Sequence, residues 1–472
     1  MKTLLTLLLT TSMALFSTTY YVNSSTGNDT LGSGTEISPW LTLSKALGAI
    51  ITGDVIDMTG TFYLDEDPGV NVFVNNGYVI GQNCTCDAVI QGQGADQTFI
   101  KACHDGELAE SRLFLINIGF SLTLRNISLQ NGYDDNGAAI QSRDEVNLEN
   151  VMISGCNTIA NQSGGTILTN GGTVSIVNST IFDNTAAVKG GALYINAYNE
   201  DITVNITNST LSHNISGTSG GAIHADLITS SETYYSNLYL NINSSTFADN
   251  IDQGGNGSFL VYNSVGLNCS YHITLKNSIL SNIGTNASGI YSLTRSYTIC
   301  NDASLPSTGS GNQNNADCLL YVLADNGGST LTHALMEGSP AVDAIPEWAG
   351  DGTFNGAPLL DQRGYARVNA NRDIGSYEGS IPYTLSSPEL TQYEYSDYIF
   401  YLSWNSVNRA TGYGVYSSPD PYGTFTLRYV VPSEGNYWDE NATLDKCFYY
   451  VTAIDSTKGD KEVPRYIYIN NP

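Results

Sequence analysis

Residues 190–214 read GGALYINAYNEDITVNITNSTLSHN, and this pattern decides the fold. A Gly-Gly turn opens a short apolar strand, and a second strand alternates apolar and polar residues as far as Asn208. Comparable small-residue turns begin at five places, 26 to 34 residues apart: Asn136, Gly164, Gly190, Gly220 and Gly254. This is the period of a solenoid, in which each repeat forms one coil.

Asn residues form a second pattern that recurs in step with these turns. Short alternating strands end on Asn126, Asn150, Asn178, Asn208, Asn243 and Asn277. A further Asn follows five to seven residues later, at Asn131, Asn184, Asn214, Asn250 and Asn282, whereas the coil from Asn150 carries Cys156-Asn157 there. Alternation with period two indicates strands with one buried face. Asn tolerates the left-handed backbone of a turn, and Gly allows a tight corner.

Together these marks predict an all-β protein whose main part is a right-handed parallel β-helix. Stacked coils bury a continuous aliphatic stripe, and strands about 4.8 Å apart allow equivalent Asn side chains to form hydrogen-bonded ladders. Several of these Asn residues stand in Asn-x-Ser/Thr patterns, which are glycosylation acceptors in a eukaryote. Their register with the strands favours the ladder, and we expect Cys156 to be a core residue.

The charge balance limits the partners. The chain has 18 Lys and Arg against 45 acidic residues, a formal net charge of −27. This argues against nucleic acid or an anionic membrane as a partner, since both require a basic surface. The acidity would attract cations such as calcium, but no specific calcium motif supports one. We therefore predict no cofactor, and a monomer that contacts a polysaccharide or a surface glycoprotein.

The first 19 residues resemble a secretory signal peptide, with Lys2 before a short apolar run. No later segment is long enough to cross a membrane, so we expect a secreted or envelope-associated protein. Residues 20–380 are assigned to the β-helix, opened by a cap whose short helix enters near Thr42. Of the eight Cys, Cys300 and Cys318 are the first disulfide pair to expect in an exported chain.

Four motifs in order mark residues of about 323–380: 323–335, 338–344, 361–367 and 373–378. They resemble the C-terminal end of the choice-of-anchor Q family of bacterial surface β-helix proteins, whose fold is like that of pectate lyase. The repeats also resemble those of polymorphic outer-membrane proteins. The resemblance implies an exported β-helix and brings no catalytic residues. We expect this segment to close the solenoid, with ion pairs among Asp361, Arg363, Arg367, Arg372 and Asp373, and His333 in a structural role.

Residues 385–472 resemble a fibronectin type III domain. Strands are expected at 401–405, 410–416 and 447–453, with alternating aromatic residues that suit the core of a two-sheet sandwich. We expect Trp438 and Tyr422 to pack in that core rather than to bind sugar. Such modules usually act as spacers.

Catalytic groups are scarce within the repeats. The adjacent acidic pair Asp134 and Asp135 lacks the elements that complete a polygalacturonase pattern. Arg125 and Lys276 stand in the same register, directly before the turn, and should point outward. Asp134, Asp135 and Arg125 are therefore the catalytic candidates if the chain is an enzyme, because glycosidic cleavage needs positioned carboxylates or a base.

The leading hypothesis is a non-catalytic secreted or cell-surface β-helix protein for adhesion or glycan binding, to which Tyr234, Tyr235 and Tyr239 can contribute. The alternative is a polysaccharide lyase or glycoside hydrolase acting on an acidic, plant or algal polysaccharide. A third is a structural spacer. The modest loops at 195–203, 223–238 and 282–301 favour the non-enzyme.

Overall fold

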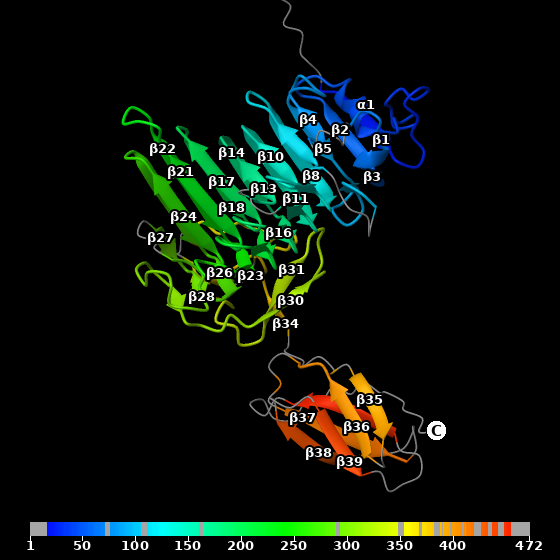
Figure 1. Ribbon diagram of the computed structural model, residues 1–472, viewed down its shortest axis with the longest axis vertical. Coiled ribbons are helices and arrows are strands. Elements are labelled where there is room, and N and C mark those ends of the chain that lie inside the picture. Colours follow the sequence, from blue (N-terminus) through cyan, green and yellow to red (C-terminus); the bar gives the residue numbers. More distant parts are fainter. Residues whose placement is uncertain are drawn as a thin grey trace, which may run out of the picture. The chain divides into compact units, whose positions relative to one another are not determined.

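The computed structural model divides the chain into two compact units, Met1–Ile381 and Pro382–Pro472 (Figure 1). In the first unit it describes residues 17–70, 76–104, 111–159, 164–288, 293–347, 354–367 and 371–381. In the second unit it describes residues 388, 390–396, 399–407, 410, 412–419, 426–432, 437–441 and 448–454. Most of the predicted signal peptide, residues 1–19, lies outside these ranges. Among the described residues, no helix is long and apolar enough to cross a membrane.

The first unit is a parallel β-helix built from two large sheets. One sheet has seven strands, which are β4 (Tyr78–Ile80), β7 (Phe114–Ile116), β10 (Ile140–Ser142), β13 (Ile167–Thr169), β17 (Leu193–Tyr198), β21 (Ile223–Ile228) and β24 (Leu260–Val265). The pairings between these strands are parallel, and each joins one coil to the next. The predicted solenoid is therefore confirmed.

The second large sheet has 22 strands and bends around the remaining sides of the coils. Its strands before the first Asn turn are β1 (Thr19–Asn23), β2 (Val55–Thr59), β5 (Ala88–Gln91), β14 (Gly172–Val177), β18 (Ile202–Thr207), β22 (Ser236–Asn243), β25 (Cys269–Lys276) and β27 (Leu293–Ser296). Two long strands, β8 (Ser121–Gln130) and β11 (Glu145–Ser154), run through that turn.

The strands that follow the first Asn turn are β3 (Thr61–Tyr63), β6 (Phe99–Lys101), β15 (Thr180–Phe182), β19 (Thr210–Ser212), β23 (Thr246–Asp252), β26 (Ile279–Ile283), β28 (Ile299–Cys300) and β29 (Gln313–Asn314). Short strands after the second turn are β9 (Tyr133–Asp134), β12 (Asn157–Thr158), β16 (Thr185–Ala186) and β20 (Ile215–Ser216).

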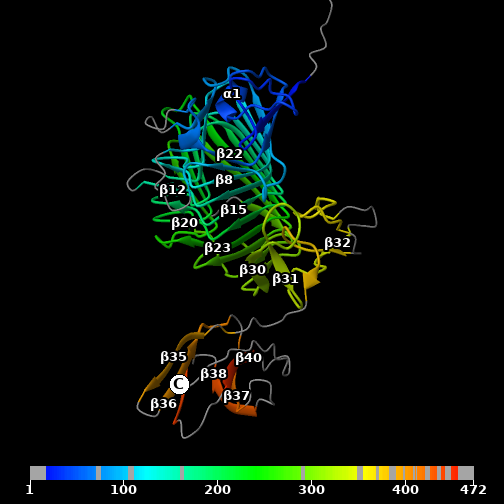
Figure 2. The ribbon, with the colours of Figure 1, turned by 90° about the vertical axis from the view of Figure 1, so that its right-hand side faces the viewer.

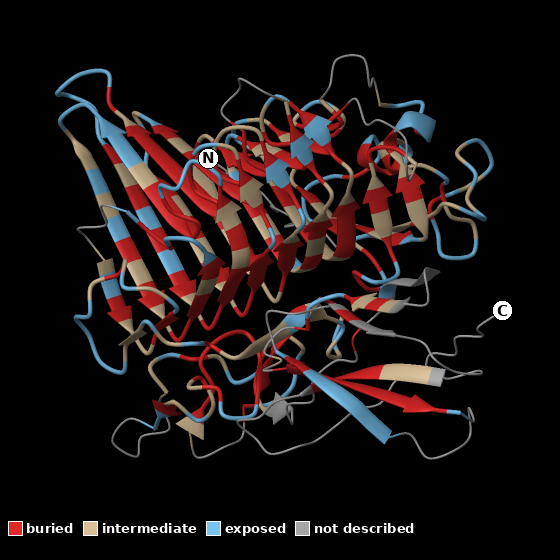
Figure 3. Cartoon of the chain, turned by 60° about the horizontal axis from the view of Figure 1, so that its bottom comes forward, coloured by how far each residue is buried: buried red, intermediate tan, exposed pale blue. Residues whose placement is uncertain are grey.

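Aliphatic side chains stack in columns along the interior. One column follows the parallel register through Leu122, Val146, Val174, Val204, Leu240 and Ile273. Each of these side chains is at most 3% exposed, and burying one stabilises the fold by roughly 1.5–3 kcal/mol. Buried and exposed residues alternate along the strands in Figure 3, as the period of two requires.

The later Asn register forms the predicted ladder. Asn184 donates to Asn214 over 3.0 Å, Asn214 to Asn250 over 2.9 Å, and Asn250 to Asn282 over 2.7 Å, from Nδ2 to Oδ1 each time. All four side chains are buried. Cys156 occupies the same register one coil earlier, where its backbone N–H donates to the Asn184 side chain, and it is buried as expected.

The earlier Asn register supplies the left-handed turn. Some of its side chains also bond between coils, from Asn150 Nδ2 to Asn126 Oδ1 over 3.1 Å and from Asn277 Nδ2 to Asn243 Oδ1 over 2.8 Å. Positive φ values near 50° occur at Asn126, Asn150, Asn178, Asn208 and Asn277. In one coil the turn residue is Ser244 (φ 50°) rather than Asn243, so the sequence prediction was off by one residue there. Thr207 pairs with Asn243 and Asn243 with Lys276, which keeps Asn243 on the strand.

The N-terminal cap forms as predicted. Helix α1 (Leu43–Leu47) follows Thr42, whose hydroxyl accepts a hydrogen bond from the Lys45 backbone N–H over 3.3 Å. Leu43, Ala46 and Leu47 of the helix are buried over the first coils. A 3-10 turn, η1 (Leu64–Glu66), ends the first coil.

The 323–380 segment lies along the side of the solenoid, not only at its last turn. Its strands are β30 (Leu320–Ala324), β31 (Thr332–Met336), β32 (Ile345–Pro346), β33 (Asn371–Arg372) and β34 (Ser380–Ile381). Gln362 contacts Thr180 and Thr210, Ser376 contacts Thr246, and Gly375 donates to Asn277. These residues belong to four successive coils, so the segment covers one side of the solenoid in addition to packing on its last coils (Figure 2).

Of the expected ion pairs, the one between Arg363 and Asp361 forms, whereas Arg367 and Arg372 find other partners. Arg363 contacts Asp361 over 2.7 Å and stacks on Tyr377, 3.6 Å from the ring centroid. Arg367 contacts Glu378 over 2.8 Å, with both side chains buried. Arg372 instead donates to the backbone carbonyl of Ala357. Burial raises the pKa of Glu378 and of Asp373, so these carboxyl groups depend on their partners to remain charged.

Cys300 and Cys318 do not form the disulfide that the sequence suggested. Both are free and buried, like most of the Cys residues among those described. The Cys300 thiol donates to Asp302 over 2.9 Å, and the Cys318 thiol faces the carbonyl of Ala316. Cys447 lies outside the described residues.

The second unit is a sandwich of two antiparallel three-stranded sheets. One holds β35 (Leu390–Ser396), β36 (Ile399–Trp404) and β39 (Tyr437–Asn441), and the other holds β38 (Thr426–Pro432), β37 (Gly412–Ser418) and β40 (Phe448–Ile454). Trp404, Tyr413 and Trp438 share its core. Trp438 therefore packs inside as expected, while Tyr422 lies outside the described residues.

Candidate functional site

The outer face of the seven-stranded sheet carries two polar or aromatic rows. Because neighbouring strands are in parallel register, Tyr194 stands beside His224, and Asn196 beside Asp226. Asp226 is followed in the next coil by Asn263. His224 and Asp226 are two residues apart on β21, so both point away from the aliphatic core.

Asp226 is the centre of a hydrogen-bonded network on this face. Its Oδ2 accepts from Lys189 Nζ over 2.6 Å and from the Tyr194 hydroxyl over 2.8 Å. Its Oδ1 accepts from His224 Nε2 over 3.0 Å and from Asn263 Nδ2 over 3.3 Å. The Lys189 ammonium also lies 5.7 Å from the Tyr194 ring centroid. Five side chains from three successive coils are therefore held together.

The contacts of His224 define its tautomer. A carboxylate only accepts, so Nε2 carries the proton that goes to Asp226, and Nδ1 of the neutral ring accepts from the Ser219 hydroxyl over 2.8 Å. Ser219, His224 and Asp226 thus form a Ser-His-Asp relay. In this relay Nδ1 faces the serine and Nε2 faces the aspartate, which is the reverse of the usual triad. Such a relay can in principle activate a hydroxyl for acyl transfer.

Burial assigns this relay a structural role in the described state. His224 has no exposed surface, and Ser219 and Asp226 are each 8% exposed. Burial alone would raise the pKa of Asp226, but hydrogen bonds from His224, Lys189 and Tyr194 hold that pKa well below its usual range. Asp226 is therefore ionised, and both of its carboxylate oxygens accept hydrogen bonds. A polymer could not reach the Ser219 hydroxyl without displacing the residues around it.

Beside this network, one corner of the solenoid exposes several tyrosines. We call it the tyrosine corner and define it by four residues with their exposed fractions: Tyr198 (55%), Tyr234 (50%), Tyr235 (63%) and Tyr239 (39%). Tyr198 ends β17, and the other three lie in or after the loop that joins β21 to β22. Tyr239 also stacks on His272 of the next coil, with ring centroids 4.8 Å apart and 10° between the planes.

Hydrogen bonds between loops hold this corner in place. Asn199 donates to the Ser230 hydroxyl over 3.0 Å and accepts from the Ser230 backbone N–H over 2.8 Å. In the following coil, Asn268 donates to the carbonyls of Glu232 and Tyr234. The tyrosine corner is thus an ordered surface formed by stacked, hydrogen-bonded loops. Clustered exposed aromatic groups with polar neighbours are a mark of an interaction site.

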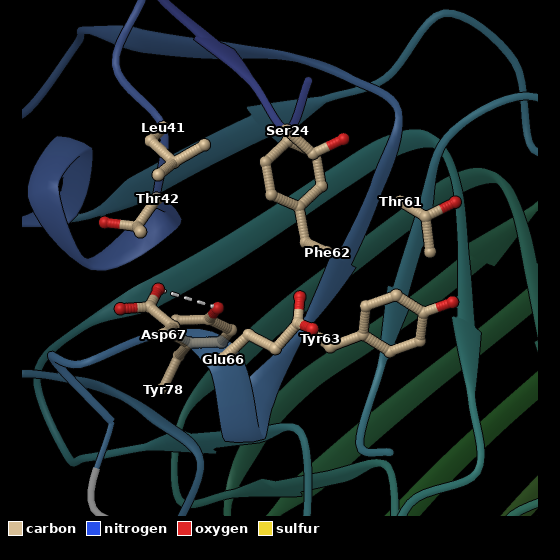
Figure 4. A pocket seen from close by; sticks show the side chains of 9 residues that line it. All are labelled: Ser24, Leu41, Thr42, Thr61, Phe62, Tyr63, Glu66, Asp67 and Tyr78. Carbon is tan, nitrogen blue, oxygen red and sulfur yellow. Dashed lines mark hydrogen bonds between the residues drawn. The ribbon is translucent and has the colours of Figure 1, made fainter. Parts of the chain in front are cut away.

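A concave feature of the described residues lies in the N-terminal cap (Figure 4). This cleft of about 250 Å³ is lined by residues that include Thr42, Phe62, Tyr63, Glu66, Asp67 and Tyr78. Asp67 accepts from the Tyr78 hydroxyl over 3.0 Å and from the Ser44 backbone N–H over 3.0 Å. Glu66 contacts His104 over 3.1 Å. Asp67 is thus engaged in hydrogen bonds within the cap, and Glu66 is left as a single exposed carboxylate. The cleft therefore does not hold an acid–base pair.

The structure does not bring the three sequence candidates together. Asp134 is buried and accepts two hydrogen bonds from Arg112, over 2.6 and 3.1 Å, while Asp135 is exposed beside it. Burial raises the pKa of Asp134 against the opposing effect of Arg112. Arg125 instead pairs with Glu149 of the neighbouring coil over 3.1 Å. Arg125 does share one outward column with Lys276, as the register predicted.

Sequence reasoning missed the network around Asp226. Lys189 and Asp226 are 37 residues apart, and only the coil period aligns them. The signal was nevertheless available in Ile223-His224-Ala225-Asp226-Leu227, where alternation puts two ionisable groups on the outer face of an otherwise apolar strand.

Neither the protein-family models nor the curated proteins that were compared with the chain match it. Among solved structures, one described as the complex structure of XylC with xylose aligns with 76% of this chain and 98% of its own chain. The sequence identity is 11% and the TM-score is 0.24. The parallel β-helix therefore rests on the strand registers themselves, and the choice-of-anchor Q resemblance stays a prediction.

Proposed function

We propose that this chain is a glycan-binding β-helix protein that acts by contact, in keeping with an adhesive role at a cell surface. The observation that carries the proposal is the tyrosine corner. Tyr198, Tyr234 and Tyr235 are each at least half exposed on loops that are hydrogen-bonded to one another. Exposed aromatic faces suit the apolar faces of sugar rings, and a rigid solenoid offers an extended surface for a polymer.

Polar groups beside the corner supply what sugar hydroxyls need. Asn263 is exposed, and Asn196, which donates to Asn170 over 2.9 Å, is partly exposed. Amide side chains both donate and accept, which matches hydroxyl groups without a requirement for charge. The net charge of −27 favours neutral or cation-bridged glycans over bare polyanions.

The test is a binding screen of the full chain against plant, algal and host polysaccharides. A Tyr198→Ala/Tyr235→Ala double variant should lose at least tenfold in affinity for any polysaccharide that binds. Tyr429→Ala is the matched control, because Tyr429 is also 55% exposed but lies in the second unit. Unchanged binding by the double variant, or equal loss in the control, would refute the tyrosine corner as the site.

The second candidate function is a polysaccharide lyase or glycoside hydrolase, and one observation favours it. Lys189, His224 and Asp226 gather ionisable groups on one outer face of the solenoid. The same screen tests it through the release of unsaturated or reducing ends, with and without calcium. Turnover that disappears in His224→Gln or in Asp135→Ala would make the protein an enzyme and locate its site.

For the remaining parts we propose supporting roles. The sheet order β35-β36-β39 and β38-β37-β40, with Trp404 in the core, favours a fibronectin type III-like module that serves as a spacer. The 323–380 segment, by its resemblance to the choice-of-anchor Q family, fits a secreted or envelope-associated protein. Deletion of residues 385–472 should leave polysaccharide binding intact if the spacer role is right.

A further inference from the structure

The structure assigns a candidate transition-metal site, separate from the tyrosine corner, to His213, Asp249 and His333. One ligand atom from each residue lies within 4.8 Å of the other two. Two imidazole nitrogens and one carboxylate oxygen are a donor set that suits Zn²⁺ and similar first-row divalent ions. We propose that such an ion, with Zn²⁺ as its representative, links β31 of the 323–380 segment to the turns of two coils.

Register brings the first two residues together. His213 and Asp249 have φ values of 55° and take the same left-handed turn position in successive coils. The His213 backbone N–H donates to the carbonyl of Ala248, which confirms that the two turns are stacked. His213 Nε2 then lies 3.6 Å from Asp249 Oδ2. Two ligands of one tetrahedral zinc, with bonds of about 2.0–2.2 Å, are separated by about 3.3–3.6 Å.

His333 reaches the same place from β31. It is 1% exposed, and its Nδ1 donates to the carbonyl of Tyr321 over 2.7 Å. Because a carbonyl only accepts, Nδ1 carries the proton, and Nε2 of the neutral ring presents a lone pair. A histidine that ligates a metal is commonly oriented by this kind of bond from its other nitrogen to a backbone carbonyl. The His333 and His213 rings stack with centroids 6.2 Å apart.

The hydrogen bonds of Ser212 leave one contact that a cation would satisfy. The Ser212 hydroxyl lies 2.8 Å from His333 Nε2 and 2.8 Å from His213 Nδ1. Its single proton goes to the His333 lone pair, so His213 Nδ1 must be the donor in the other contact. His213 Nε2 then faces the Asp249 carboxylate over 3.6 Å, and a cation completes this contact, either a proton on Nε2 or a metal ion.

Metal binding requires the ligand atoms, which lie within 4.8 Å of one another, to move to the separation of about 3.3–3.6 Å in a tetrahedral site. The lone pair of His333 Nε2 passes from the Ser212 hydroxyl to the metal, while Ser212 continues to accept from His213. The side chains of His213 and Asp249 are 43% and 44% exposed, so an ion can enter from solvent and keep a water as its fourth ligand. The consequence would be a clamp that fastens the 323–380 segment to the side of the solenoid.

The test uses the full chain without an affinity tag, freed of metal with a chelator and then dialysed against ZnCl₂. We expect one zinc per chain and a higher thermal unfolding midpoint, since a ligand that binds the native state stabilises it. His213→Gln and Asp249→Asn, two partly exposed positions that should fold normally, are expected to lose at least tenfold in zinc affinity and the rise in midpoint.

Two matched controls guard against loose surface binding. His272→Gln removes an exposed histidine elsewhere, and Asp183→Asn removes the exposed carboxylate at the same turn position on the other side of His213. Both should bind zinc within twofold of the unmodified chain. Substoichiometric zinc in the unmodified chain would overturn the proposal, as would affinity losses in the controls that equal those of His213→Gln and Asp249→Asn.

Discussion

The two outer sides of the solenoid differ in what covers them. On the β15–β19–β23 side, Thr180, Thr210 and Thr246 point outward, yet each is at most 1% exposed because the 323–380 segment lies over them. At the tyrosine corner, by contrast, Tyr198 and Tyr235 are more than half exposed. The same repeat therefore produces a covered side, whose buried contacts stabilise the fold, and an exposed corner, which a ligand can reach. Mutations on the covered side should change stability, and mutations at the corner should change binding.

The largest effect is expected where the covered side holds a buried charge. Arg367→Met should destabilise the first unit by about 3–5 kcal/mol, because it leaves Glu378 buried without its counter-ion. Arg125→Met is the matched control, since the Arg125–Glu149 pair is roughly half exposed and should contribute at most about 1 kcal/mol. Denaturant unfolding of both variants measures the difference. Equal losses in the two would mean that the covered side has no special role.

The Asn ladder should give the next largest effect. Asn250→Ala removes the acceptor of the Asn214 backbone and side-chain N–H groups, and the donor to Asn282. Buried donors left without partners cost about 1–3 kcal/mol, so we expect a loss of about 2–3 kcal/mol. Asn241→Ala, at an exposed Asn that donates to Asn205, should stay within about 0.5 kcal/mol of the unmodified chain. Urea unfolding midpoints separate the two, and a ladder variant as stable as the control would contradict this account.

Local pattern was enough to predict the coils but not what covers them. Alternation and turn residues fix which side chains face inward, and they led correctly to the buried Asn184–Asn282 ladder. They could not place the 323–380 segment, since the Gln362–Thr180 contact joins residues 182 positions apart in an aperiodic part of the chain. The Asp226 network lay within reach of the pattern but was overlooked, whereas the Asp134 partner Arg112 lies before the clear repeats. The turn at Ser244 comes one residue after Asn243, since the strand register runs without a break from Thr207 through Asn243 to Lys276.

A pH-dependent contribution of smaller size should come from Asp226. Its pKa is held below the usual range against the effect of burial, so its stabilisation is fully present above the unfolded pKa of about 4 and is lost as the pH falls. Asp226→Asn should cost about 1–3 kcal/mol at pH 7, and the gap from the unmodified chain should narrow towards pH 3. Thermal unfolding across that range tests this, with the exposed Asp201→Asn as control. A gap that stays constant with pH would show that the Asp226 charge is not the source.

The smallest change in stability, and the largest in binding, should occur at the tyrosine corner. Tyr235 is 63% exposed, so Tyr235→Ala removes little buried surface and should alter the free energy of unfolding by less than about 0.5 kcal/mol. If the corner stacks on sugar rings, the same change should weaken polysaccharide binding several-fold. Tyr235→Phe keeps the ring and should bind almost normally, since stacking needs the aromatic face rather than the hydroxyl. Affinity electrophoresis of the two variants decides this, because equal weakening by Ala and Phe would assign the contact to the hydroxyl and not to ring stacking.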